Sequence, residues 1–169
     1  LVPGFNDEKD DSLKIQLDKV QEVDNCLMVI LNGYIDTYNS VYFQKPVGKI
    51  VSAGFVNLIF NCSSLNYVSS TGIGSFTAFL KLVKPKGGDI VLLNIQPKVY
   101  EVFQLLGFSQ FFNIKNSAEK DGKIVKIACT AYDPYHPFKG RYILLTTSEN
   151  AYIKNRAELD NPALNPQLF

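Results

Sequence analysis

Hydroxyl side chains gather in the segment NYVSSTGIGSF, residues 66–76, between an apolar run and a stretch with helical periodicity. Ser and Thr occupy positions 69–71, directly before Gly72 and Gly74. A helix that begins here has unpaired N–H groups and a partial positive charge at its N-terminus, and both suit an anion. A hydroxyl at such a position can cap the helix, bind a phosphate group or accept one covalently, and the residue types leave all three roles open.

The same segment lacks the patterns of the common nucleotide-binding loops. It contains no G-x-x-x-x-G-K-[ST] sequence, and Gly72-x-Gly74 has no third glycine at the spacing of a dinucleotide-binding loop. We therefore expect no cofactor at this position.

Alternating apolar strands and amphipathic segments must position these hydroxyls. Their order is β-β-α-β-α-β-α-β, which predicts an α/β fold with a mixed, mostly parallel sheet and helices packed against it. The segment 61–70 reads as a loop, and residues 117–121 read as the start of another helix. The expected strands are 13–17, 26–31, 56–60, 89–94 and 111–114, and the expected helices are 40–53, 72–83 and 97–106.

The chain divides into three parts by texture. Residues 1–11 are acidic and read as a flexible leader that is not a secretory signal, and residues 12–121 hold the α/β domain. Residues 122–169 form an extension with two strand-like runs, KIVKIACTAY and RYILLTTSE, and an Asn/Pro-rich tail. We expect these runs to form a β-hairpin that pairs with the sheet edge or with another chain, which would make the protein a homodimer.

Composition narrows the classes of function. The 169 residues carry a formal net charge of +1, which argues against a protein that binds nucleic acid through its overall charge. No apolar run approaches the roughly 18 residues that a membrane-spanning helix needs, so we expect no span.

Cysteine usage predicts neither a metal site nor a disulfide framework. Cys26, Cys62 and Cys129 form no C-x-x-C pair, and the first two lie in apolar runs where a buried thiol behaves as a small hydrophobic side chain. This usage favours a reducing, cytoplasmic location.

His136 is the only histidine of the chain, which leaves little basis for catalysis. It lies in the loop YDPYHPFKGRY with Asp133, Lys139 and Arg141, and polar residues in a turn-rich loop are most often simply solvated. No nucleophile and second base accompany His136, so we expect no catalytic residues.

Four motifs in order resemble the STAS domain of bacterial anti-anti-sigma factors over residues 13–121. LNGYIDTYNS, residues 31–40, is similar to the family's Leu-x-Gly-Glu-Leu-Asp, with Tyr34 in place of Glu. VNLIFNCSSLNYVSSTGIGSF is similar to the family's strand followed by Asp-Ser-Ser-Gly-Leu-Gly. GGDIVLLNIQPKVYEVFQLLGFSQFFNI is similar to its glycine pair, buried strand, helix, Leu-x-Gly and Phe-x-Ile.

The resemblance implies a partner-switching regulator that is not an enzyme. The unmodified domain would bind an anti-sigma factor with serine kinase activity, phosphorylation would end that binding, and a serine phosphatase would restore it. The family's phosphoacceptor falls on Ser70, with Ser69 and Thr71 as local alternatives, and Ser69 stands where the family usually has Asp.

The resemblance also places a partner surface around this segment. Its expected members are Asp36, Tyr67, Gly72, Ile73 and Gly74. Asp36 has an equally weighted alternative role as a cap for the first helix. A second class of function is a STAS scaffold or ligand-sensing module, of the stress-sensor or lipid-transport type, that is not phosphorylated.

Overall fold

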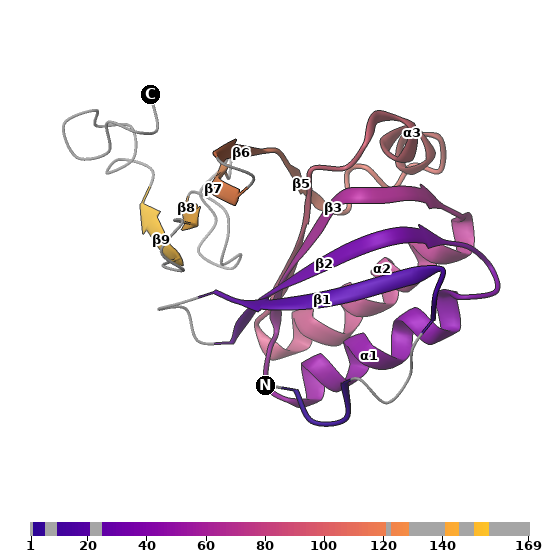
Figure 1. Cartoon of the computed structure of the whole chain (residues 1–169), viewed down its shortest axis with the longest axis horizontal. Coiled ribbons are helices and arrows are strands. Elements are labelled where there is room, and N and C mark those ends of the chain that lie inside the picture. The colour runs from indigo at the N-terminus through magenta and orange to yellow at the C-terminus, as the bar shows by residue number, and fades with distance from the viewer. Residues whose placement is uncertain are drawn as a thin grey trace.

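A five-stranded mixed sheet and three α-helices are built from residues 13–115 (Figure 1). The computed structural model describes residues 2–5, 10–20, 25–120, 123–128, 141–145 and 151–155, with side-chain surroundings up to Asn116. The strands of this sheet are β1 (Leu13–Lys19), β2 (Cys26–Ile35), β3 (Asn57–Val68), β4 (Asp89–Leu93) and β5 (Asn113–Lys115). The helices are α1 (Ser40–Ser52), α2 (Ser70–Val83) and α3 (Pro97–Leu105), with a 3₁₀ turn at Lys84–Lys86.

The strands lie in the order β1-β2-β3-β4-β5, with β1 antiparallel to β2 and the other neighbours parallel. This confirms the expected mostly parallel α/β sheet. Helices α1 and α2 lie side by side under β1 and β2 (Figure 1). Because the parallel strands share one direction, the loops after β2 and β3 meet at the same edge of the sheet.

Aromatic side chains fill the space between the sheet and the helices. Phe43 of α1 lies edge-on to Phe79 of α2, with ring centroids 5.0 Å apart, and Phe60 of β3 lies edge-on to Phe76 at 5.2 Å. Phe103 of α3 joins them at 6.2 Å from Phe76. The expectation that Phe76, Phe79 and Phe103 lie on core faces is therefore confirmed, since each is at most 1% exposed.

Two strands extend beyond their expected ends. β2 continues through Gly33 to Ile35. β3 continues to Val68 and replaces most of the expected loop 61–70 by pairing with β2 as far as Ile35. Gly33 makes this possible, because its φ is +128° and a Cβ there would lie 2.1 Å from the Ser12 carbonyl oxygen. Consequently α2 starts at Ser70, two residues earlier than expected.

The N-terminal segment differs from the expected flexible leader where the structure describes it. Val2 is buried in the core on the helix side, and Phe5 packs against that core. The Lys49 ammonium of α1 donates to the Gly4 carbonyl oxygen at 2.6 Å. Residues 2–5 are thus attached to α1, while residues 6–9 lie outside the described part.

Four short strands follow the domain: β6 (Ser117–Lys120), β7 (Lys123–Ala128), β8 (Arg141–Leu145) and β9 (Ala151–Asn155). The expected helix start at Ser117 is wrong, because these residues pair antiparallel with β7 and take their backbone partners from it. β7 also pairs antiparallel with β8, and β8 with β9. Cys129, Asp133, His136 and Lys139 lie outside the described residues.

The aromatic core predicts a large difference between two Phe→Ala substitutions. Phe76→Ala should lower the free energy of unfolding by about 3–5 kcal/mol, because it leaves a cavity among four other rings. Phe111, which is 68% exposed, provides the matched control. Urea unfolding measures both, and equal losses for the two variants would contradict this account of the core.

Candidate functional site

The three hydroxyl residues lie where α2 begins, at the ends of β2 and β3. The Ser69 amide donates to the Ile35 carbonyl oxygen at 2.8 Å, which ties the start of α2 to the last residue of β2. Ser69 has extended backbone angles and is the N-cap, and its Oγ accepts from the Gly72 amide at 3.1 Å. The capping role that the sequence left open is therefore filled by Ser69.

Ser70 and Thr71 differ from Ser69 in accessibility. Ser69 is half-buried and its hydroxyl is used as the cap, whereas Ser70 and Thr71 are both exposed in the first turn of α2. Amides in a helical first turn have no intrahelical acceptor, so an anion here adjoins N–H donors and the positive end of the helix. The geometry favours Ser70 or Thr71 over Ser69 as a modifiable hydroxyl.

The two glycines that follow have opposite surroundings. A Cβ on Gly72 would lie 2.7 Å from Cγ2 of Ile35 and 2.9 Å from Cγ1 of Val68, whereas a Cβ on Gly74 would meet no atom within 4 Å. Gly72 therefore lets α2 pack closely on the ends of both strands. Ile73 is fully buried in the core, so of the three residues expected to contact a partner here, only Gly74 lies at the surface.

Asp36 organises the turn between β2 and α1. Its Oδ1 accepts from the amides of Tyr38 and Asn39, both at 2.8 Å. These bonds close the turn before α1 and do not cap the helix, whose N-cap is Asn39 with no side-chain cap bond, so the capping alternative for Asp36 is wrong. They place the carboxylate one residue from the Ile35 carbonyl that contacts Ser69.

Asn39 is a buried polar residue whose role the sequence did not reveal. Its Oδ1 accepts from the Asp36 amide at 2.9 Å, and its Nδ2 donates to Ser12 Oγ at 2.7 Å and to the Tyr34 carbonyl oxygen at 2.9 Å. With an exposed fraction of only 4%, it links the start of β1, the end of β2 and the start of α1. A single Asn carries no signal of such a network in a sequence.

Exposed tyrosines surround this edge of the sheet. Tyr34 and Tyr67 are register partners on neighbouring strands and are 42% and 53% exposed. Tyr38 and Tyr42 follow on the loop and first turn of α1, at 87% and 52%. The expected exposure of Tyr67 is confirmed. The sequence feature that could have indicated the other exposed tyrosines is Tyr34, which stands where the family motif has Glu.

Cys26 and Cys62, the two cysteines in the described part of the chain, lack the properties of a nucleophile. Burial raises the pKa of both the Cys26 and the Cys62 thiol to about 12, so both are neutral near pH 7. Within the described residues, no group of three or more His, Cys, Asp or Glu side chains could hold a metal ion. That same part of the chain has no helix long and apolar enough to cross a bilayer.

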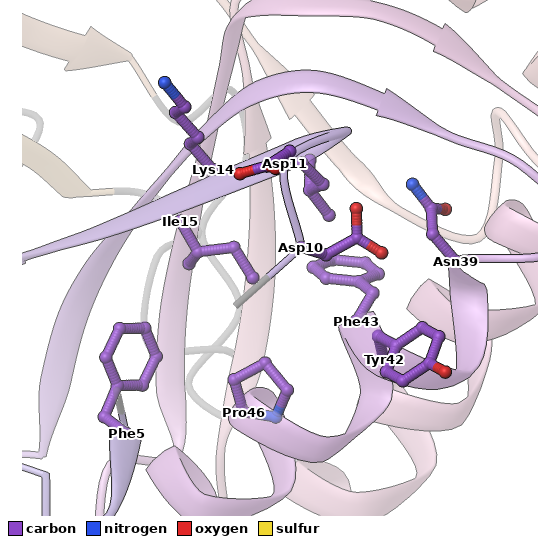
Figure 2. Close-up of a pocket in the computed structure, with 10 residues that line it drawn as sticks. Phe5, Asp10, Asp11, Lys14, Ile15, Asn39, Tyr42, Phe43 and Pro46 are labelled. Atoms are coloured by element: carbon purple, nitrogen blue, oxygen red, sulfur yellow. The ribbon is translucent and has the colours of Figure 1, made fainter. Parts of the chain in front are cut away.

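A cavity of about 310 Å³ opens between the N-terminal segment, β1 and α1 (Figure 2). Phe5, Ile15 and Phe43 give it apolar walls, and the carboxylates of Asp10 and Asp11 lie at one side. It is separate from the α2 N-terminus, and Asn39, which lines it, connects it to the loop at Asp36.

Comparison with known proteins agrees with this fold. The STAS domain model matches residues 19–120, more than half of the chain, and the chain belongs to the STAS domain family. BtrV of Bordetella bronchiseptica, named as a candidate anti-sigma factor antagonist, is 28% identical over 116 residues, which cover 69% of this chain and 97% of BtrV. The anti-sigma-B factor antagonist of Bacillus subtilis is 27% identical over 105 residues, covering 62% of this chain and 94% of that protein.

Solved structures show the same fold. The anti-sigma factor antagonist SpoIIAA in its unphosphorylated form superposes with a TM-score of 0.54 at 20% identity, covering 63% of this chain and 90% of that chain. The family resemblance inferred from the four motifs is thus confirmed. The chain is distantly related to anti-sigma factor antagonists.

The two glycines at the start of α2 predict substitutions with opposite effects on stability. Gly72→Ala should destabilise by about 1–3 kcal/mol, because its Cβ overlaps Ile35 and Val68. Gly74→Ala should stabilise by about 0.5–1 kcal/mol, because the site is open and Ala favours a helix. Denaturant unfolding of the two variants tests this, and a loss of stability in Gly74→Ala as large as in Gly72→Ala would contradict the packing described.

Proposed function

We propose that this protein is an anti-sigma factor antagonist that switches partners through phosphorylation of Ser70. The observation that carries the proposal is the exposed Ser70 at the first turn of α2, beside a neighbouring serine that already caps the helix. In this proposal the unmodified domain binds an anti-sigma factor with serine kinase activity, and a serine phosphatase reverses the modification. The domain acts in the cytoplasm by binding and has no catalytic residues of its own.

The charge of a phosphate explains how one group can change binding and preserve the fold. Phosphoserine adds about −1.5 to −2 charges. At the N-terminus of α2 that charge is compatible with the free amides and the helix dipole. In an interface with the exposed tyrosines 34, 38 and 67 the same charge must lose its water, which weakens the complex.

Ser69 in place of the usual Asp does not remove the cap. Its Oγ already accepts from the Gly72 amide, the bond that an Asp carboxylate makes at such a position. The substitution leaves the first turn without a formal negative charge beside Ser70, which lowers the repulsion that a phosphate meets there.

The relatives support this assignment. Two of them are named as antagonists of an anti-sigma factor, and SpoIIAA is known in an unphosphorylated and a phosphorylated form. In the proposed complex the docking residues are Asp36, Tyr67 and Gly74 at the surface, with Gly72 and Ile73 supporting the helix from within.

Phosphopeptide mass spectrometry tests the modification directly. After incubation of the full chain with Mg-ATP and the anti-sigma kinase encoded in the same genome, we expect one phosphate in the peptide covering residues 61–81, on Ser70. Ser70→Ala should abolish it, and the matched variants Ser69→Ala and Thr71→Ala should keep it. Phosphate on Thr71 would correct the acceptor by one residue, and a fully covered, unmodified peptide with active kinase would contradict the proposal.

A charge substitution tests the switch in binding. Ser70→Glu should weaken the complex with the anti-sigma factor at least about tenfold, or roughly 1.4 kcal/mol, because it places a charge in the interface. Calorimetric titration measures the affinity, and a melting curve checks that the fold is kept. Ser52→Glu, at the far end of α1, is the control; equal weakening by both substitutions would argue against a switch at Ser70.

The cavity favours a second candidate function, a ligand-sensing STAS module. Its apolar walls and paired carboxylates could hold a small molecule, and Asn39 would connect that molecule to the loop at Asp36. An unmodified peptide in the phosphorylation experiment would favour this function over the switch.

A further inference from the structure

The five-stranded sheet has a second face, opposite the three α-helices, which we call the back face. Strand register places Met28, Ile59 and Val91 in one row across β2, β3 and β4, and Ile30, Asn61 and Leu93 in the next. None of these six belongs to the core on the helix side, to which residues 27, 58 and 90 contribute. The back face therefore has its own apolar band over the first half of the strands.

The helices and the N-terminal segment pack against the other face of the sheet. The buried side chains Phe43 of α1, Phe76 of α2 and Phe103 of α3 all belong to the helix-side core. Val2 belongs to it as well. The helices and residues 2–5 thus pack on the helix side of the sheet. Of the described elements, those that follow β5 remain available to cover the back face.

The apolar band is nevertheless shielded from water. Ile59, Val91 and Leu93 are 0% exposed, and Met28 is 5% exposed. Farther along β2 on the same face, Asn32 is exposed and Tyr34 is 42% exposed. The shielding therefore ends between the start of the strands and the edge that carries the candidate site.

We propose that the chain after β5 covers this apolar band in cis, as a second layer that includes β6 to β9. Met, Ile, Val and Leu make up most of this face, and Asn57, Asn61 and Asp89 are the buried polar residues within and beside the band. A mainly apolar face needs such a cover, because exposed apolar patches of that kind are rare in monomers. The connection permits it, since Asn116 alone separates β5 at the sheet edge from β6.

The extension has a matching apolar pattern. Ile127, Ile143 and Ile153 occupy partner positions on β7, β8 and β9, so three neighbouring strands share an isoleucine row. A small sheet with such a row also needs a partner, and two apolar sheet faces satisfy each other by packing about 10 Å apart. The extension is then part of the folded domain and not an arm exchanged between two copies.

This arrangement leaves the candidate site accessible. The covered band lies at the start of β2 and β3, and Ser70 follows their opposite ends. The proposal is independent of phosphorylation, because it concerns the face and the strand ends away from α2's N-terminus.

The two buried cysteines provide a test within the full-length chain. Cys26 lies at the start of β2, one row before Met28 on the back face, while Cys62 belongs to the helix-side core. In a Cys129→Ser background, both thiols should resist iodoacetamide, at low and at high protein concentration. Ile143→Asp should raise the alkylation rate of Cys26 at least about tenfold and leave Cys62 protected. Tyr142→Asp, at the adjacent position of β8, is the matched control and should change neither rate.

Each outcome decides the proposal. Rapid alkylation of Cys26 in the parent protein would mean that the face is open and awaits another protein, and protection that grows with protein concentration would mean that a second copy covers it; both overturn the proposal. Continued protection in Ile143→Asp would overturn it as well. If Ile143→Asp exposes both thiols, the milder Ile143→Ser decides: a rise for Cys26 alone supports the cover, and equal rises overturn it.

Discussion

The close contact between the start of α2 and the ends of β2 and β3 is the constraint on which the candidate site depends. It consists of the 2.8 Å hydrogen bond from the Ser69 amide to the Ile35 carbonyl oxygen and of the packing of Gly72 against Ile35 and Val68. A side chain at position 72 would push the helix away from the strands. This contact holds the first turn of α2 at the edge of the sheet. Ser70 therefore lies near the loop at Asp36, and not at a helix end that stands away from the sheet.

The same strands serve two purposes along their length. Their first halves are buried on both faces and form the stable centre of the sheet. Beyond Ile30 and Asn61 the back face becomes polar and aromatic, and the pairing of β2 with β3 continues through a register irregularity near Gly33. The buried first half holds the second half in place, so under the proposed function a charge added at Ser70 acts on a surface whose backbone is already fixed.

The sequence predicted the elements whose signal is a periodic apolar pattern, and it missed those that depend on a distant partner. The buried strands and the phenylalanine faces of α2 and α3 follow from periodicity alone. The second half of β3 has the polar sequence NCSSLNY, which resembles a loop, and it is a strand because β2 supplies its hydrogen bonds. The bond from Asn39 to Ser12 has the same cause, since its partner lies 27 residues away in the chain. The strand at Ser117 was missed for another reason: its partner β7 is the next strand, but the pairing contains a register irregularity and its residues show no clear strand pattern.

At the site itself, residue types defined the chemistry and only geometry separated the roles. Three adjacent hydroxyls could each cap, bind or accept a phosphate, and nothing in their order distinguishes them. A helix has one N-cap, and the residue that fills it spends its oxygen on a backbone amide. Because Ser69 is the cap, this half-buried residue has its hydroxyl oxygen hydrogen-bonded, and the exposed hydroxyl residues are the next two. The cap therefore has a second consequence besides satisfying a backbone amide: it determines which hydroxyls of the first turn remain exposed to solvent.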